Sequence, residues 1–138
     1  TENRGVRVCI RKRPIFPHER QGGEFDVITC LSGRVVVHDA RMHPDMVNMF
    51  MNHHDFAFDE SFGETADNDM VYQGTASKLV QQSLQGRHGT VMMYGQTGSG
   101  KTYTMKAIYQ SAANDLFVNA GGRALTVCFV ELVGDSCF

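Results

Sequence analysis

The chain has 138 residues, 42% of them apolar and 20% charged, and its 13 basic and 15 acidic side chains give a formal net charge of −2. This is the size of one ordinary globular domain, large enough to bury a core without disulfide bonds. The near-neutral charge argues against a nucleic-acid platform, and we expect neither an export signal nor a membrane span, because the longest apolar run, 125–133, is interrupted by Glu131.

A first strand is predicted over residues 6–11, where apolar residues alternate with charged or polar ones until Pro14 stops the pattern. Two short runs, 25–30 and 34–38, then flank a Ser-Gly pair. β-branched runs around such a pair predict a hairpin.

The stretch 39–54 is rich in Met, His and Asn and follows no clear period, so we expect a long loop or a short helix there. Its methionines are expected to pack beneath that loop. His53 and His54 form no H-x-x-x-H pattern and have no cysteine nearby, so we expect no metal site at them. Residues 55–59 alternate again, which predicts a strand with both phenylalanines on one face.

A helix is predicted from an N-cap at Thr65 or Asp67 to about Gln85, with Gly86 as its stop. The apolar run 90–94 that follows is too short for a helix and is followed at once by glycines. It therefore predicts a buried strand.

A second helix is predicted from Lys101 to about Asn119, where two glycines follow, and the run 125–133 predicts a final buried strand. The order of these elements is strand, helix, strand, glycine loop, helix, strand. It predicts an α/β fold with a mainly parallel central sheet flanked by helices.

The segment Gly95-Gln-Thr-Gly-Ser-Gly-Lys-Thr102 fits the pattern G-x-x-x-x-G-K-[ST] and lies between a predicted strand and a predicted helix. Glycines let successive backbone N–H groups point inward as an anion nest, and the following helix adds its positive dipole end. The expected nucleotide-binding residues of this loop are Gly95, Gln96, Thr97, Gly98, Ser99, Gly100, Lys101 and Thr102. The alternative is a glycine-rich turn with an incidental lysine.

Two side chains of this loop carry the expected chemistry. Lys101 would reach the β- and γ-phosphates, and the Thr102 hydroxyl would ligate Mg²⁺. Lys101 and Thr102 are therefore the candidate catalytic residues, and Thr102 is the candidate metal ligand. No N-K-x-D guanine motif occurs in the chain, which favours ATP as the nucleotide.

Four segments, in order, resemble the kinesin motor domain. Tyr94-Gly-Gln-Thr-Gly-Ser-Gly-Lys-Thr-Tyr-Thr-Met105 closely resembles the phosphate-binding signature of that family. Val8-Cys-Ile-Arg-Lys-Arg-Pro14 is similar to its first strand with R-x-R-P, and residues 56–62 match F-x-F-D-x-x-F. Residues 127–132 resemble the strand with F-x-E-[IL] that follows the phosphate-loop helix.

The resemblance implies a P-loop NTPase fold, with residues 1–138 as the N-terminal part of a single, truncated motor domain. It implies a microtubule-stimulated ATPase that binds ATP or ADP with Mg²⁺, has microtubules or tubulin as its partner, and is located on the cytoplasmic cytoskeleton, including the mitotic spindle. The absence of any C-x-x-C pair fits such a reduced setting.

The resemblance also implies an adenine site formed by Arg11, Pro14 and Tyr103. A guanidinium group and a phenol ring are both suitable planes for stacking on a base. The alternative is a solvated strand end for Arg11 and a helix-surface position for Tyr103.

Within the family, residues 10–14, 24–28 and 55–60 resemble the kinesin-13 branch, whose members depolymerise microtubule ends. That branch carries an elongated second loop with a Lys-Val-Asp tip that engages tubulin. The corresponding stretch 39–54 is long enough, but its candidate tip is His43-Pro44-Asp45, so only the acid matches.

The sequence also departs from the family pattern. Kinesins carry a glycine-containing loop after the position of Met105, whereas here Lys106 follows directly, so the loop is shortened or residues are absent from the sequence. The switch motifs and the main microtubule-binding helix would follow Phe138, so we expect the 138-residue segment alone to hydrolyse ATP negligibly. The alternative function is a non-catalytic tubulin-binding fragment with an incomplete ATP site. Glu131 and Asp135 are expected to have structural or surface roles.

Overall fold

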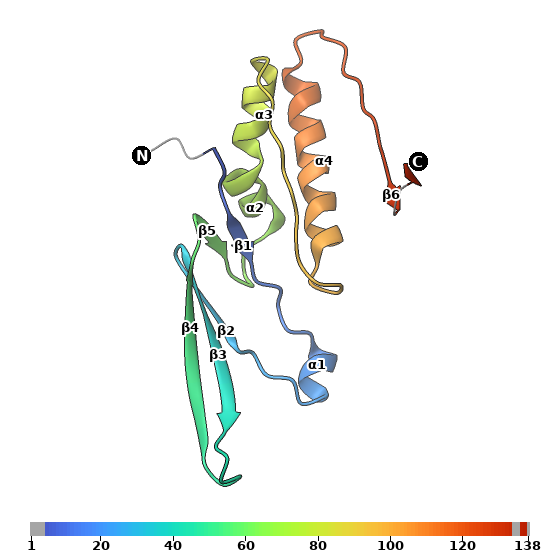
Figure 1. Cartoon of the computed structure of the whole chain (residues 1–138). Helices are drawn as coiled ribbons and strands as arrows, with labels where there is room; N and C mark the ends of the chain where they lie inside the picture. Colours follow the sequence, from blue (N-terminus) through green and yellow to red (C-terminus); the bar gives the residue numbers. More distant parts are fainter. Residues whose placement is uncertain (1–4, 134–135, 138) are drawn as a thin grey trace.

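The computed structural model describes residues 5–133 and 136–137, and it combines a small parallel strand pair, an antiparallel sheet and a group of helices (Figure 1). The three longer helices lie at one end of the molecule and the antiparallel sheet at the other, with the parallel pair between them, and a short helix over residues 17–21 lies on the side of the antiparallel sheet. In the described part of the chain no helix has both the length and the apolar character needed to cross a membrane.

The parallel pair consists of β1 (Cys9–Arg11) and β5 (Glu60–Phe62). The Lys12 amide extends the pair by donating to the Phe62 carbonyl at 2.8 Å, and the Asp59 amide donates to the Val8 carbonyl at 2.9 Å. The predicted first strand is thus confirmed over its second half.

An antiparallel sheet is formed by β2 (Ile28–Leu31), β3 (Arg34–Met42) and β4 (Met49–Ala57). A tight turn joins β2 to β3, which confirms the predicted hairpin. The strand predicted over 55–59 is the end of β4 and reaches only Ala57.

The prediction of a loop or short helix over residues 39–54 is wrong. Most of this stretch continues β3 and β4, which pair without interruption from Arg34–Ala57 to Met42–Met49. Cross-strand pairing fixed near the core propagates outward, because each new pair costs little once the register is set. We call residues 38–53, which extend past the paired part of β2, the hairpin arm.

The tip of the hairpin arm is closed by the side chain of Asp45. Its carboxylate accepts hydrogen bonds from the amides of Val47 and Asn48, both at 3.0 Å, and from the Asn48 side chain at 2.6 Å. These bonds, led by the one from the Asn48 amide, lower the pKa of the Asp45 carboxyl. Met46 has a positive φ of 58°, as a tight turn requires of one of its residues.

Four helices complete the described part of the fold: α1 (Pro17–Gln21), α2 (Asn68–Thr75), α3 (Ser77–Leu84) and α4 (Lys101–Asn119). The helix predicted over 65–85 is divided in two at Ala76, whereas its N-cap is confirmed because the Asp67 carboxylate accepts from the Met70 amide at 2.7 Å. The helix predicted over 101–119 is confirmed with the same bounds.

The core lies where α2 and α3 pack between β5 and α4. Its buried residues are Phe62, Ala66, Val71, Tyr72, Ala76, Val80 and Ile108. Gly74 allows α2 to approach β5 closely, since a Cβ at this position would lie only 2.6 Å from the Phe62 ring.

Tyr72 links α2 to α4 through a hydrogen bond from its buried hydroxyl to Asp115 Oδ2, at 2.6 Å. Burial, together with the Asp115 carboxylate, raises the pKa of the Tyr72 phenol, so the hydroxyl stays protonated as the donor.

Tyr72→Phe, which removes this hydrogen bond, is expected to lower the free energy of unfolding by about 1–2 kcal/mol, measured by urea denaturation. Tyr109→Phe, which removes an exposed hydroxyl, is the control and is expected to change it little. Equal effects of the two variants would contradict this role.

Two predicted strands are not formed. Residues 90–94 are extended, with Val91 and Met93 packed partly against the core, but pair with no strand among the described residues. Residues 125–131 also pair with no described strand and are exposed, with Phe129 at 87% exposure, so the predicted buried strand over 125–133 is wrong there. Extended chain counts as a strand only when a neighbour takes up its backbone hydrogen bonds.

After this exposed segment, β6 (Leu132–Val133) and β7 (Ser136–Cys137) form a two-residue antiparallel pair. Asp135, one of the two acids expected to have a structural or surface role, lies outside the described residues.

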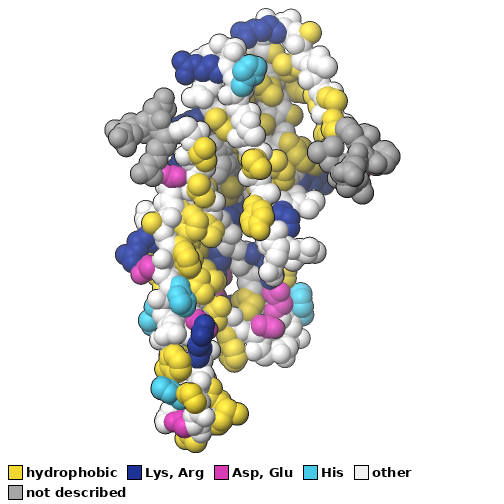
Figure 2. Space-filling model, in the orientation of Figure 1, with side chains coloured by type: hydrophobic (Ala, Val, Ile, Leu, Met, Phe, Trp, Pro, Cys, Tyr) yellow, Lys and Arg dark blue, Asp and Glu magenta, His cyan; other side chains and the backbone are white. Residues whose placement is uncertain are grey.

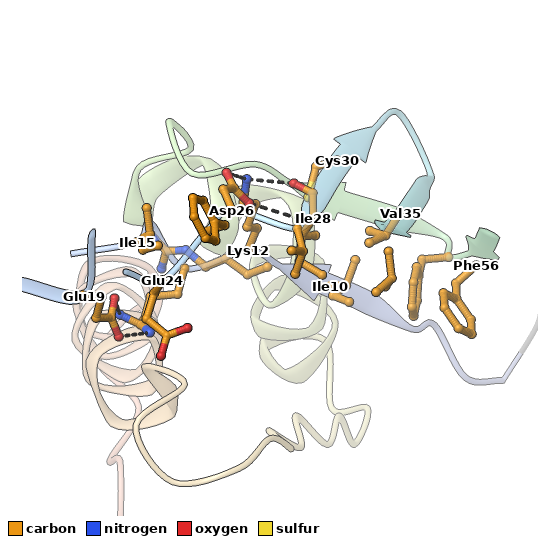
Figure 3. Close-up of a pocket in the computed structure, with 16 residues that line it drawn as sticks. Ile10, Lys12, Ile15, Glu19, Glu24, Asp26, Ile28, Cys30, Val35 and Phe56 are labelled. Atoms are coloured by element: carbon orange, nitrogen blue, oxygen red, sulfur yellow. Dashed lines mark hydrogen bonds and ion pairs between the residues drawn. The ribbon is translucent and has the colours of Figure 1, made fainter. Parts of the chain in front are cut away.

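A groove of about 650 Å³ separates β1 from the antiparallel sheet. Figure 3 shows Ile10, Val35 and Phe56 at its apolar end and the charged groups at the other. There the Lys12 ammonium donates to Asp26 Oδ2 at 2.5 Å and to the Ile28 carbonyl at 2.8 Å. Ile10 of β1 and Lys12 just after it thus line the groove, whereas the guanidinium of Arg11 reaches α2 and α4.

Candidate nucleotide-binding site

The glycine-rich loop leads directly into the N-terminus of α4. Three glycines of the loop, Gly95, Gly98 and Gly100, have φ angles of 153°, 83° and 91°. Residues that carry a Cβ rarely adopt such values. Gly100 is the N-cap of α4, so the free amides of the first helical turn lie beside the loop. This is the arrangement in which helix termini bind phosphate groups.

The space in front of this loop is a shallow hollow of about 470 Å³. Its lining residues are Thr97, Gly98, Gly100, Lys101, Thr102 and Tyr103. The structure therefore brings together, around one opening, most of the loop residues predicted from the sequence.

The ammonium group of Lys101 donates a hydrogen bond to the Gln96 carbonyl at 2.8 Å, across the loop. A lysine ammonium has three donors, so two remain for phosphate oxygens while the third keeps the loop closed. Thr102 is exposed in the first turn of α4, at the rim of the hollow, so its hydroxyl is accessible to a metal ion. A hydroxyl oxygen of this kind suits Mg²⁺, which prefers oxygen ligands.

Arg11 and Tyr103, predicted to hold the base, lie together: the Arg11 guanidinium carbon is 5.7 Å from the centroid of the Tyr103 ring. The guanidinium donates to Asn68 Oδ1 at 2.7 Å, Thr104 Oγ1 at 3.0 Å and the Ala66 carbonyl at 3.0 Å. Hydrogen bonds to a guanidinium lie in its plane, so stacking uses its faces, and here the group lies over the Tyr103 ring. Arg11 lines the groove beside β1 and not the hollow in front of the loop.

Pro14, the third predicted base contact, is exposed and does not line the hollow. Its neighbour Arg13 approaches the loop instead, since a Cβ at Gly100 would be 4.0 Å from Arg13 Cδ. Arg13 forms two hydrogen bonds to Glu19 of α1 (Pro17–Gln21), at 2.7 and 3.0 Å. With the Phe16 amide, Arg13 lowers the pKa of Glu19 to about 2.

Sequence analysis missed the residues that hold Arg11 in place. Asn68 is the first residue of α2, and Thr104, one turn into α4, is a buried polar residue. Neither belongs to a recognisable motif. The only sequence signal for these two partners of Arg11 was a polar residue near the start of each predicted helix. Many residues with no such role have the same position.

Other predicted features lie apart from this site. Helix α4 runs without interruption through Met105 and Lys106, so no loop divides it there. Glu131 is exposed at the end of an unpaired segment. Among the described residues no group of three His, Cys, Asp or Glu side chains is placed to hold a metal ion.

Comparison with known proteins gives consistent matches. The family model described as the kinesin motor domain matches residues 11–131. The chain is 39% identical over 136 residues to the diatom spindle kinesin-1 of Cylindrotheca fusiformis, covering 94% of this chain and 22% of that protein. It is 41% and 40% identical over 124 residues to the kinesin-like protein KIF24 of Mus musculus and Homo sapiens, covering 85% of this chain and 9% of each relative. The chain thus spans less than a quarter of the length of these relatives.

Proposed function

Because the chain belongs to the kinesin motor-domain family, we propose that residues 1–138 are the N-terminal part of a single motor domain that hydrolyses ATP under stimulation by microtubules. Membership in this family also confirms the predicted α/β fold of a P-loop NTPase. The observation that supports nucleotide binding most directly is the loop 95–102, whose glycines have positive φ angles in front of the free amides of α4.

In the proposed complex, the loop amides and Lys101 bind the β- and γ-phosphates of ATP, and the Thr102 hydroxyl helps to hold Mg²⁺. Bound Mg²⁺ neutralises charge that develops on the phosphate oxygens. The adenine stacks near Arg11 and Tyr103, which lie at the same end of α4 as the loop. Pro14 remains a proposed edge of the base site.

Steady-state ATP hydrolysis, with and without microtubules, tests this proposal. The full-length protein is expected to show a microtubule-stimulated rate, whereas the 138-residue segment is expected to turn over negligibly because phosphoryl transfer also needs a group that positions the attacking water. A microtubule-stimulated rate from the segment itself would contradict the expectation for the segment. Tubulin binding by the full-length protein with no ATP hydrolysis would instead favour the non-catalytic alternative.

We further propose that the motor depolymerises microtubules and that the hairpin arm contacts tubulin. The arm extends away from the body (Figure 1), and its tip carries hydrophobic side chains on the surface (Figure 2). Met46 and Val47 are 76% and 80% exposed there, so the predicted packing of the methionines beneath a loop is wrong. Exposed apolar side chains at the end of a projecting element suit contact with a protein partner.

Asp45→Ala is expected to reduce depolymerisation of stabilised microtubules by the full-length protein several-fold, with basal ATP hydrolysis unchanged. The physical reason is that the Asp45 carboxylate holds the tip in one conformation, so its loss raises the entropic cost of contact. Asp69→Ala, which removes an exposed acid in the first turn of α2, is the control. If Asp45→Ala depolymerises microtubules at the normal rate, the arm has no such role.

The proposed function also implies where in the cell the protein acts. We propose that the protein acts on microtubules of the cytoskeleton and that the spindle is one such place, because the diatom relative is named a spindle kinesin.

A further inference from the structure

Two histidines separated by 15 positions in the sequence meet at the base of the hairpin arm. His38 on β3 is paired with His53 on β4, and their Nδ1 atoms are 2.8 Å apart. The His38 amide donates to Val27 on the opposite side, so this is a non-hydrogen-bonded pair, the kind in which cross-strand side chains stand closer. The meeting of the two rings is therefore a consequence of the strand register.

The sequence predicts no metal site at His53, because its partner His38 is brought to it only by the strand register. We propose that His38 and His53 form a two-histidine site for a transition-metal ion, Cu²⁺ in particular, at the base of the arm. The site is open to solvent, because His38 is half-buried and His53 is exposed. An ion can therefore reach both nitrogens from solvent, and neutral imidazole nitrogens are common metal ligands.

The affinity order of the divalent ions favours copper at this site. The observed 2.8 Å is that of a hydrogen bond between the two rings, so one ring must turn before both nitrogens face a common ion. The exposed His53 ring has room to turn in this way, and two imidazole nitrogens bound to one ion at about 2.0–2.1 Å lie about 3 Å apart, close to the present separation. Cu²⁺ binds most strongly among the divalent first-row ions.

The surroundings orient the His38 ring. Thr29 Oγ1 is 2.8 Å from His38 Nε2, so when the ring N–H donates to this hydroxyl, the Nδ1 lone pair points toward His53. In that tautomer His53 Nδ1 carries the proton of the hydrogen bond between the rings, and this proton must leave Nδ1 when a metal binds there. The exposed His53 ring can carry it on Nε2 instead, so no net proton is released by the neutral rings.

Charges near the site are balanced. On the same face, Arg34 is paired with Asp55 at 2.7 Å, so neither charge faces an incoming ion alone. His54 belongs to the opposite face, where it lies 3.6 Å from Asp39. His54 is thus a neighbour in sequence that does not share the site, which makes it a matched control.

Titration of the whole chain with Cu²⁺, followed by electron paramagnetic resonance, tests the proposal. We expect one tightly bound ion with two nitrogen couplings. His38→Gln and His53→Gln are each expected to weaken binding at least about tenfold and to remove one coupling, and Thr29→Val is expected to weaken it less. His54→Gln and His43→Gln are expected to bind as the unmodified chain does.

The fold of each variant is checked by circular dichroism without copper, so that a loss of binding can be separated from unfolding. Bound Cu²⁺ is also expected to slow hydrogen exchange of arm amides, because it links β3 to β4 where β2 no longer supports them. The proposal is overturned if His54→Gln weakens binding as much as His53→Gln, or if folded His38→Gln and His53→Gln variants bind Cu²⁺ normally.

Discussion

Lys101→Ala is expected to weaken Mg²⁺-ATP binding at least about a hundredfold while leaving the fold intact. Charge-assisted hydrogen bonds contribute about 1.5–3 kcal/mol each, and about 1.4 kcal/mol corresponds to a tenfold change in affinity. Two of the three donors of the Lys101 ammonium are available for phosphate, so the loss of both exceeds a hundredfold. Titration with a fluorescent ATP analogue measures this effect directly.

Lys106→Ala is the matched control, because Lys106 is exposed on the same helix and lies outside the hollow. It is expected to bind nucleotide normally. Unchanged affinity in Lys101→Ala would remove the assignment of the loop 95–102 as a phosphate site. Circular dichroism of both variants separates a binding defect from unfolding.

Arg11→Ala is expected to lower the free energy of unfolding by about 2–4 kcal/mol, measured by urea denaturation. The guanidinium of Arg11 joins β1 to the N-terminus of α2 and to α4 through hydrogen bonds to Asn68, Thr104 and the Ala66 carbonyl. Because Thr104 is buried, its hydroxyl would lose this partner in a place that water reaches poorly.

Arg87→Ala removes an exposed arginine and serves as the control for loss of positive charge. A loss of stability no larger than in Arg87→Ala would mean that the Arg11 hydrogen bonds contribute nothing measurable. Arg11→Lys keeps the charge but loses the planar group, so it is expected to weaken stacking of the adenine as well as part of the network. Normal ATP affinity in a folded Arg11→Lys variant would argue against Arg11 as a base contact.

Much of the nucleotide site was predictable because its information is local. The loop 95–102 and the helix that follows are adjacent in the sequence, and glycines at fixed spacing determine the φ angles of the loop almost by themselves. The proximity of Arg11 to Tyr103 depended on resemblance to a family, since 92 positions separate the two residues. Their role in binding the base stays a prediction.

The hairpin arm was not predictable in the same way. Residues 39–54 lack the alternation of a half-buried strand because both faces of the arm are open to solvent. The arm is a ribbon because the pairs near Val35 and Phe56, at the groove, set a register that the rest of β3 and β4 follows. The meeting of His38 and His53 follows from the same register.

By itself, the sequence determined the glycine loop, the extent of α4, the hairpin at Ser32 and Gly33, and the N-cap at Asp67, because each depends on residues within a few positions of one another. The tertiary structure alone decided which extended segments became strands. Residues 9–11 found a parallel partner in 60–62, whereas 90–94 and 125–131 have none among the described residues. A strand is stabilised by backbone hydrogen bonds to a neighbour, and only the folded arrangement supplies that neighbour.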